Sequence, residues 1–196
     1  MIVYLHGFSS GAASQKATAL QKALAPTLMI VPEYPSHRPH DAIAMLTERL
    51  SKQSSQSEKQ KIVLVGSSLG GYYAQYLATR LDYISGIVLI NPALQPELTL
   101  QPYIGQQTNQ VTGGLFEFSQ KDFQELAEFD VPVNKISVPT LVLLDEGDEL
   151  IDYQYAAYRY SGIGRVVVYP GGSHWFEHLP AAIPEIRTFY ETLEQV

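Results

Sequence analysis

The stretch GSSLG at residues 66–70 places a serine, Ser68, in the pattern G-x-S-x-G. In this nucleophile elbow the serine occupies a sharp turn between a strand and a helix, with its hydroxyl exposed at the edge of a sheet. The glycines are needed because side chains at their positions would collide with the neighbouring strand and helix. An apolar run precedes the motif and a helical pattern follows it, which favours a nucleophile. The alternative is that Ser68 is only a small residue between glycines that allow the chain to reverse.

A nucleophilic serine needs a base, and the base needs a group that orients it. In folds with this elbow the order along the chain is Ser, then Asp or Glu, then His, with the acid after a late strand and the histidine after the last one. His174 follows the apolar run 165–169 in a Gly-rich loop, and we predict that it is the base. Asp148 follows the run 140–144 and the turn glycine Gly147, and we predict that it is the orienting acid.

Other acidic residues follow the same apolar run as Asp148. Asp145 lies at the very end of the predicted strand and matches the position of the orienting acid less well, although the sequence leaves it open. The remaining three are interpreted as solvated loop charges: Glu146, Glu149 and Asp152.

The tetrahedral intermediate of acyl transfer also needs hydrogen-bond donors for its oxyanion. One predicted donor is the amide of Leu69, directly after the nucleophile, and the other is the amide of Phe8, in a loop after an earlier strand. Gly7 lets the backbone of that loop approach the acyl group. Each donor is expected to stabilise the transition state by about 3 kcal/mol. His6 is interpreted as a structural residue that supports this loop, because the base is already assigned to His174.

Two pairs of histidines offer a metal-binding alternative. The sequence HWFEH at residues 174–178 fits H-x-x-E-H, the inverted zincin motif, which needs a continuous helix and a further carboxylate ligand downstream. Glycines precede this stretch and a proline follows it, so we expect no zinc site and interpret His178 as a surface or loop histidine. A proline also separates His37 from His40, and we interpret both as loop residues that bind no metal.

Short apolar runs with strand character alternate with helical patterns along the chain. Six runs are predicted as strands, at residues 2–5, 27–31, 61–66, 85–90, 140–144 and 165–169. Each run is continuously apolar, as expected for strands that are covered on both faces. Strands that alternate with helices predict an α/β fold with a mainly parallel sheet and right-handed crossovers.

Helical patterns follow most of these runs. Predicted helix starts are Ser14 and Asp41 as caps and Pro184 as the first residue of the last helix, while a helix is also expected after Ser68 and over 153–160. The apolar positions recur at helical spacing in four sets: Ala17, Leu20 and Leu24; Ile43, Leu46 and Leu50; Tyr73, Leu77 and Leu81; Ile183, Ile186, Tyr190 and Leu193.

Two segments interrupt the alternation of strands and helices. Residues 51–60 are polar and of low complexity, and are interpreted as a solvated loop or a frayed helix end. Residues 95–135 contain no clear buried strand, and we predict that they form a cap or lid over the active site. The alternative for this segment is an ordinary surface excursion with its own small apolar cluster. The whole chain, residues 1–196, is expected to form a single domain.

Composition and charge narrow the classes of function. A net charge of −7 and a pI near 5.2 leave no basic stripe for a phosphate backbone, so we expect no nucleic-acid partner. The absence of cysteine excludes disulfides, thiol nucleophiles and cysteine-based metal sites. The sequence has neither a signal-peptide pattern nor an apolar run of the roughly 18 residues needed to span a bilayer. A cytoplasmic protein without membrane insertion is the expectation.

Five motifs together resemble those of a known family. HGFSS, GSSLGGYYA, NPAL, GDELIDY and GGSHWF follow one another between residues 6 and 176. They are similar to the motifs of the YqiA/YcfP-like small bacterial esterases of the α/β-hydrolase superfamily, for which GSSLGGYYA and GDELIDY are specific. The resemblance implies a minimal α/β-hydrolase fold with a cap insertion after the fourth strand. It also implies a triad of Ser68, Asp148 and His174 and an oxyanion hole formed by Phe8 and Leu69.

These observations predict a serine hydrolase that cleaves small acyl esters through an acyl-enzyme and needs no cofactor. An acyl thioesterase with the same triad is one alternative, although the acidic net charge disfavours a phosphate-rich thioester such as an acyl-CoA. A second alternative, of a different class, is a catalytically silent binding protein with this fold. Such proteins usually lack a triad member or an oxyanion glycine, whereas every required position is filled here.

Overall fold

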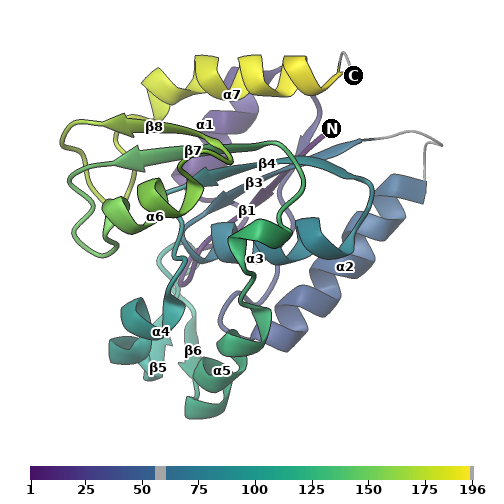
Figure 1. Ribbon diagram of the computed structural model, residues 1–196. Coiled ribbons are helices and arrows are strands. Elements are labelled where there is room, and N and C mark those ends of the chain that lie inside the picture. The colour runs from purple at the N-terminus through teal and green to yellow at the C-terminus, as the bar shows by residue number, and fades with distance from the viewer. Residues whose placement is uncertain (56–60, 195–196) are drawn as a thin grey trace.

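A parallel β-sheet forms the centre of the protein (Figure 1). The structure, a computed structural model, describes residues 1–55 and 61–194. In these ranges six strands form one sheet in the order β2-β1-β3-β4-β7-β8, and every neighbouring pair is parallel. The strands are β1 (Ile2–Leu5), β2 (Met29–Ile30), β3 (Ile62–Ser67), β4 (Ile84–Ile90), β7 (Thr140–Asp145) and β8 (Arg165–Tyr169). The predicted α/β class and parallel sheet are confirmed.

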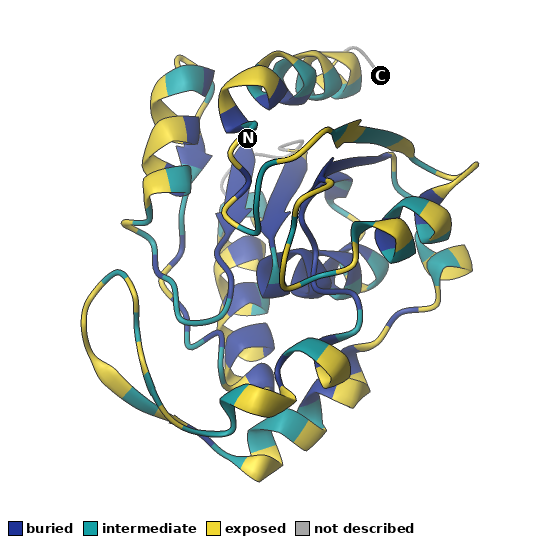
Figure 2. Cartoon of the chain, turned by 90° about the vertical axis from the view of Figure 1, so that its left-hand side faces the viewer, coloured by how far each residue is buried: buried dark blue, intermediate teal, exposed yellow. Residues whose placement is uncertain are grey.

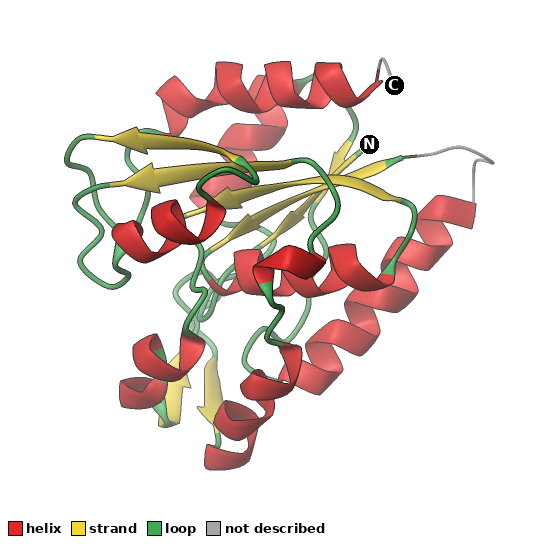
Figure 3. Ribbon diagram, viewed as in Figure 1, coloured by secondary structure: helices red, strands yellow, loops and turns green. Residues whose placement is uncertain are grey.

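Helices cover both faces of this sheet (Figures 1 and 3). One face carries α1 (Gln15–Leu24) and α7 (Leu179–Glu194), and the other carries α2 (Pro39–Ser55), α3 (Leu69–Arg80) and α6 (Tyr153–Tyr160). Side chains of a strand alternate between the two faces, so the sheet has a core on each side. In β1, Ile2 and Tyr4 belong to the core under α1 and α7, whereas Val3 and Leu5 belong to the other core. Figure 2 shows that the central strands are buried while helices have exposed outer surfaces.

Of the two predicted helix caps, one is confirmed and one is wrong. The Ser14 cap of α1 is confirmed, because its hydroxyl accepts a hydrogen bond from the amide of Ala17. The Asp41 cap is wrong, since α2 begins at Pro39 and Asp41 lies inside its first turn. A proline suits that first position, because its missing N–H would have no partner there. The carboxylate of Asp41 still lies near the positive end of the helix dipole.

The last helix also begins earlier than predicted. α7 begins at Leu179, and Pro184 lies in its interior instead of at its start. An interior proline removes one backbone hydrogen bond. Leu179 and Ala182, which precede Pro184, are buried in the core under this helix, and their burial offsets the lost bond.

The ends of the sheet and the polar stretch 51–60 also differ in detail from expectation. β2 is shorter than the predicted run 27–31, because this edge strand pairs only with Ile2 and Val3 of β1. Residues 51–55 continue α2 to its end at Ser55, and residues 56–60 lie outside the described part of the chain.

The excursion 95–135 follows β4 and contains short helices and a small hairpin on the α3 side of the sheet (Figure 1). Its elements are α4 (Pro96–Thr99), η1 (Gln101–Tyr103), β5 (Gly105–Thr108), β6 (Leu115–Phe118), α5 (Gln120–Glu125), η2 (Leu126–Phe129) and η3 (Val133–Lys135). β5 and β6 pair antiparallel and form a separate sheet. This hairpin was not predicted, because its strands are partly exposed and lack a continuous apolar run.

Candidate active site

Ser68 lies at the turn between β3 and α3 with an unusual backbone conformation. Its φ of 53° and ψ of −123° are rare for a residue other than glycine. A Cβ atom on Gly66 would lie 2.4 Å from the carbonyl oxygen of Gly70, and one on Gly70 would lie 2.1 Å from the carbonyl oxygen of Leu5. Both glycines of the motif are therefore sterically required, and the turn has the strained geometry of a nucleophile elbow.

The structure brings Ser68, His174 and Asp148 together. The Nε2 atom of His174 lies 3.1 Å from the Oγ atom of Ser68, and its Nδ1 atom lies 2.9 Å from Oδ2 of Asp148. The side chain of Asp148 is 1% exposed and that of His174 is 19% exposed. Oδ1 of Asp148 also accepts hydrogen bonds from the amides of Leu150 and Ile151, which fix the orientation of the carboxylate. The predicted base thus lies within hydrogen-bond reach of both the predicted nucleophile and the predicted orienting acid.

The two predicted oxyanion donors lie beside this serine. A Cβ atom on Gly7 would lie 3.0 Å from the Cβ of Ser68, so the loop that carries Phe8 passes directly beside the nucleophile. Leu69 is the first residue of α3, where an amide has no partner within the helix. Within residues 1–55 and 61–194, neither the Phe8 nor the Leu69 amide donates to another group of the protein.

Contacts from the α2 side hold the loop of Gly7 in place. His6 is 1% exposed and stacks on the ring of Tyr34, with ring centroids 4.2 Å apart. The Tyr34 hydroxyl donates to the carbonyl of His6, and the Ser36 hydroxyl donates to the carbonyl of Gly7 at 3.1 Å. Burial lowers the pKa of His6, which favours the neutral imidazole. These contacts agree with the interpretation of His6 as a supporting residue.

The excursion packs directly on the same loop. The amide of Gln110 donates to the carbonyl of Ser9 at 2.7 Å, and the side-chain amide of Asn109 donates to the carbonyl of Ser10 at 2.8 Å. The Phe8 ring contacts three aromatic rings of the excursion, with centroids 5.0 to 5.9 Å away: Tyr103, Phe116 and Phe118. Residues 95–135 therefore help to fix the position of a predicted oxyanion donor.

The other acidic residues have more specific contacts than the sequence analysis expected. Asp145 is fully buried and faces His178 instead of His174. The three predicted loop charges are exposed, but each accepts a hydrogen bond: Glu149 from the amide of His174 at 3.0 Å, Asp152 from the amide of Gln154 at 2.9 Å, and Glu146 from the hydroxyl of Tyr153 at 3.2 Å. Asp152 thereby caps α6. The position of Asp145 directly after the apolar run 140–144 was the one sequence signal for such a contact.

The two histidines of H-x-x-E-H do not share a site. The helix that the zincin motif requires begins only at Leu179, after both histidines, and the two rings face different carboxylates. His178 lies in a turn before α7, in agreement with its interpretation as a surface or loop histidine, but its side chain is engaged. Its Nδ1 atom lies 2.9 Å from Oδ1 of Asp145 and its ring stacks on Tyr169. No group of three potential metal-ligating side chains occurs among the described residues.

The other histidine pair contacts the excursion. His37 lies in a loop as expected and packs on Phe116 with ring centroids 4.3 Å apart. His40 lies in the first turn of α2 instead of a loop, with its Nε2 atom 3.4 Å from a carboxylate oxygen of Glu128. Both histidines therefore fasten the excursion to the beginning of α2.

A lysine that the sequence analysis overlooked lies next to the elbow. Lys16, from α1, is partly buried and donates from its Nζ atom to Oγ of Ser67 at 2.8 Å. Burial lowers the pKa of Lys16 to about 8, while the charges of Asp148 and Asp145 act in the opposite direction. The helical pattern of α1 gave no indication of this contact, because it depends on how α1 crosses the end of β3.

Replacing Lys16 by methionine is expected to change how stability depends on pH. The pKa of about 8 in the folded protein lies below the value of 10.5 for a free lysine. Between pH 8 and pH 10.5, Lys16 binds more protons in the unfolded chain than in the folded protein. The free energy of unfolding therefore rises with pH in this range. Below about pH 8, the charged and partly buried Lys16 destabilises the folded protein to its full extent. From pH 7 to 9.5 the stability of the wild type should rise by about 1 to 2 kcal/mol relative to Lys16→Met.

Urea unfolding of both proteins at the two pH values measures this difference. Lys22→Met, on an exposed residue of the same helix, is the matched control and should leave the difference between the two pH values unchanged. If the difference in the free energy of unfolding between the wild type and Lys16→Met were the same at both pH values, the lowered pKa of Lys16 would be contradicted.

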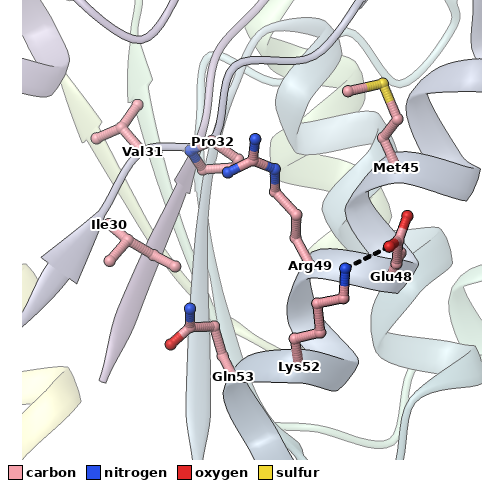
Figure 4. Close-up of a pocket in the computed structure, with 8 residues that line it drawn as sticks. All are labelled: Ile30, Val31, Pro32, Met45, Glu48, Arg49, Lys52 and Gln53. Atoms are coloured by element: carbon pink, nitrogen blue, oxygen red, sulfur yellow. Dashed lines mark hydrogen bonds and ion pairs between the residues drawn. The ribbon is translucent and has the colours of Figure 1, made fainter.

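A separate groove lies away from Ser68 (Figure 4). It has a volume of about 480 Å³ and lies between α2 and the end of β2. Its lining residues are Ile30, Val31, Pro32, Met45, Glu48, Arg49, Lys52 and Gln53. It includes none of the predicted site residues.

In the part of the chain that the structure describes, no helix combines the length and apolar character needed to cross a membrane.

Sequence comparison identifies relatives over nearly the full chain. The model of one protein family, described as "Uncharacterised protein family (UPF0227)", matches residues 1–191. A UPF0227 protein from Shewanella oneidensis is 29% identical over 193 residues, which cover 96% of this chain and 98% of the relative. A UPF0227 protein from Shewanella woodyi is 26% identical over 191 residues.

Structure comparison identifies α/β hydrolases. Est1E from Butyrivibrio proteoclasticus with bound ferulic acid superposes with a TM-score of 0.81 and 16% identity, covering 100% of this chain and 89% of Est1E. An α/β superfamily hydrolase from Oenococcus oeni gives a TM-score of 0.68 at 16% identity, covering 98% and 92% of the two chains. These similarities show that the sheet and its helices form the predicted α/β-hydrolase fold.

Proposed function

The chain belongs to the Uncharacterised protein family UPF0227, and from the geometry around Ser68 we propose that it is a serine hydrolase that cleaves carboxylic esters. One observation carries the proposal, the continuous contact from Ser68 Oγ to His174 Nε2 at 3.1 Å and from His174 Nδ1 to Asp148 at 2.9 Å. A serine hydroxyl becomes a useful nucleophile when a base accepts its proton and an acid holds that base in the correct tautomer.

The proposed reaction has two steps. In the first, His174 accepts the proton of Ser68 while the hydroxyl oxygen attacks the ester carbonyl, and the amides of Phe8 and Leu69 bind the oxyanion. His174 then gives its proton to the leaving alcohol, which leaves an acyl-enzyme. In the second step, a water molecule takes the place of the alcohol and gives a proton to His174 while its oxygen attacks the acyl carbon. The bond from that carbon to Ser68 Oγ then breaks, His174 returns the proton to Oγ, and the acid leaves. Asp148 stabilises the charged imidazole in both steps.

The excursion 95–135 acts as a cap in this proposal, within a single domain. Its hairpin bonds to the backbone of Ser9 and Ser10, next to the proposed donor Phe8. Tyr72, which is buried in α3, anchors the other end of the excursion by donating to the carbonyl of Leu126 at 2.7 Å. A segment fixed to both the elbow helix and the oxyanion loop is well placed to line the acyl site.

Matched butyryl substrates distinguish the ester from the thioester alternative. We expect hydrolysis of p-nitrophenyl butyrate. We also expect kcat/KM for butyryl-CoA to be at least about 10-fold below that for the small thioester of N-acetylcysteamine at low salt. The net charge of −7 repels the phosphates of CoA, so the ratio of the two kcat/KM values should approach one as salt is added. A preference for butyryl-CoA would favour a thioesterase, and binding of all three without hydrolysis would favour a silent binding protein.

A further inference from the structure

Asp145 is hydrogen-bonded to the loop that carries His174. This residue ends β7, its side chain is 0% exposed, and its carboxylate accepts three hydrogen bonds. Oδ2 accepts from the amide of Glu177 at 2.8 Å and from the amide of Ser173 at 3.3 Å, while Oδ1 lies 2.9 Å from Nδ1 of His178. The two amides lie on either side of His174 in the sequence, so one carboxylate holds both arms of the loop.

Asn91 holds the same loop from the neighbouring strand. It follows β4, is 1% exposed, and has a positive φ of 39°. Its Oδ1 atom accepts from the amide of Asp145 at 2.9 Å. Its Nδ2 atom donates to the carbonyl of Ser173 at 3.0 Å, and the carbonyl of His174 lies 3.4 Å away. Asn91 thereby joins Asp145 and the loop in one network.

The fit around Asp145 leaves no room for the loop to move closer. A Cβ atom on Gly172 would lie 2.0 Å from Oδ2 of Asp145, and Gly172 has a φ of 76°. On the other side, the ring of His178 stacks on Tyr169 with centroids 5.1 Å apart and an angle of 9° between the planes. The contacts therefore extend from residue 172 to residue 178, with His174 between them.

We propose that Asp145, together with Asn91 and His178, is a positioning element that keeps His174 in contact with both Ser68 and Asp148. None of the three touches the Ser68 hydroxyl, so they act through the loop. Hydrogen bonds to a buried carboxylate are strong, and a displacement of about 1 Å in a catalytic group can lower a rate about 100-fold. The inference rests on the proposed function, because His174 is the proposed base.

Kinetics of three variants test this role. Asp145→Ala removes all three acceptor contacts and should lower kcat about 30- to 100-fold, with KM within about twofold because the oxyanion loop and the excursion are untouched. Asp145→Asn should recover kcat to within about threefold of the wild type. Its carboxamide oxygen can accept both amides while its NH₂ group can donate to Nδ1 of His178 in the tautomer that carries the proton on Nε2. Asp152→Ala, which removes an exposed carboxylate from the same β7–α6 connection, is the control and should keep kcat within about twofold.

A spectroscopic signal tests the positioning without any ester hydrolysis. The imidazole proton of His174 that is shared with Asp148 should give a downfield proton resonance, assigned by its loss in His174→Gln. We expect Asp145→Ala to remove or broaden this resonance and Asp145→Asn to retain it, with the fold of each variant checked by circular dichroism. If the wild type cleaves no ester, the proposed function fails while this readout still decides whether Asp145 positions His174.

A second variant applies if Asp145→Ala does not fold. His178→Phe keeps a ring against Tyr169 but removes the Nδ1 contact to Asp145, and should lower kcat about 3- to 10-fold and broaden the His174 resonance. The proposal is overturned if folded Asp145→Ala, or in its place folded His178→Phe, keeps both the wild-type kcat and the wild-type resonance.

Discussion

Replacing Ser68 by alanine should lower kcat for ester hydrolysis at least about 10⁴-fold while the protein keeps its fold. The Oγ atom of Ser68 is the group that lies 3.1 Å from His174, and no other hydroxyl is assigned to the attack on the ester. Alanine keeps the Cβ atom and leaves Gly66 and Gly70 in place, so the turn has no reason to rearrange. Initial rates with p-nitrophenyl butyrate and a thermal unfolding curve measure the two expectations.

The neighbouring serine is the matched control for this variant. Ser67 is buried at the end of β3 and accepts a hydrogen bond from Lys16, so its hydroxyl is already engaged away from His174. Ser67→Ala should keep kcat within about threefold of the wild type. Equal losses in the two variants would mean that the elbow is disturbed generally, and retained activity in Ser68→Ala would remove Ser68 from the mechanism.

Replacing Gly70 by alanine should produce a large loss of stability. The new Cβ atom would lie 2.1 Å from the carbonyl oxygen of Leu5 and 2.7 Å from that of His6, both of which are backbone atoms at the end of β1. Because neither atom can turn away as a flexible side chain can, α3 must move away from the sheet. We expect a loss of at least about 3 kcal/mol in the free energy of unfolding, measured by urea titration.

Gly114→Ala is the control for this substitution. In the hairpin of the excursion, the added Cβ would meet only the Thr112 hydroxyl at 3.3 Å, which can rotate, so the free energy of unfolding should change by less than about 1 kcal/mol. A Gly70→Ala protein as stable as the wild type would contradict the close packing of α3 on β1.

The sequence predicted the residues that local patterns define. Ser68 was found because glycines that a sharp turn requires surround it, and the order of strands then pointed to Asp148 and His174. These predictions rested on the order of serine, acid and histidine along the chain in folds with this elbow, with the acid and the histidine after late strands. The geometry of the structure brings the three residues together, and their catalytic role is the proposal that the experiments test.

The contacts that were missed depend on residues far apart in the chain. Asn91 and Asp145 are separated by 54 positions and meet only because β4 and β7 are neighbours in the sheet. A polar residue directly after a buried strand was the available signal for each, but the sequence does not specify that His178 turns toward Asp145. The hairpin of β5 and β6 was missed for a different reason, since its strands are too short and too exposed to show an apolar pattern.

The helix starts illustrate competition between local and tertiary effects. Asp41 is a good capping residue by type, yet Pro39 begins α2 two residues earlier because a proline fits the first helical position. Pro184 was predicted to begin α7 for the same reason, but burial of Leu179 and Ala182 extends the helix upstream of it. Helix propensity alone could not predict which of these two prolines begins its helix, because packing against the sheet decides where each helix starts.

The intact mass of the protein after incubation with a fluorophosphonate probe tests whether Ser68 is an activated nucleophile. The probe reacts with serines whose hydroxyl is activated by a neighbouring base. We expect a single adduct on the folded wild type and no adduct on Ser68→Ala or on heat-unfolded protein. No adduct on the folded wild type, or the same adduct on Ser68→Ala, would contradict the proposal that Ser68 is an activated nucleophile.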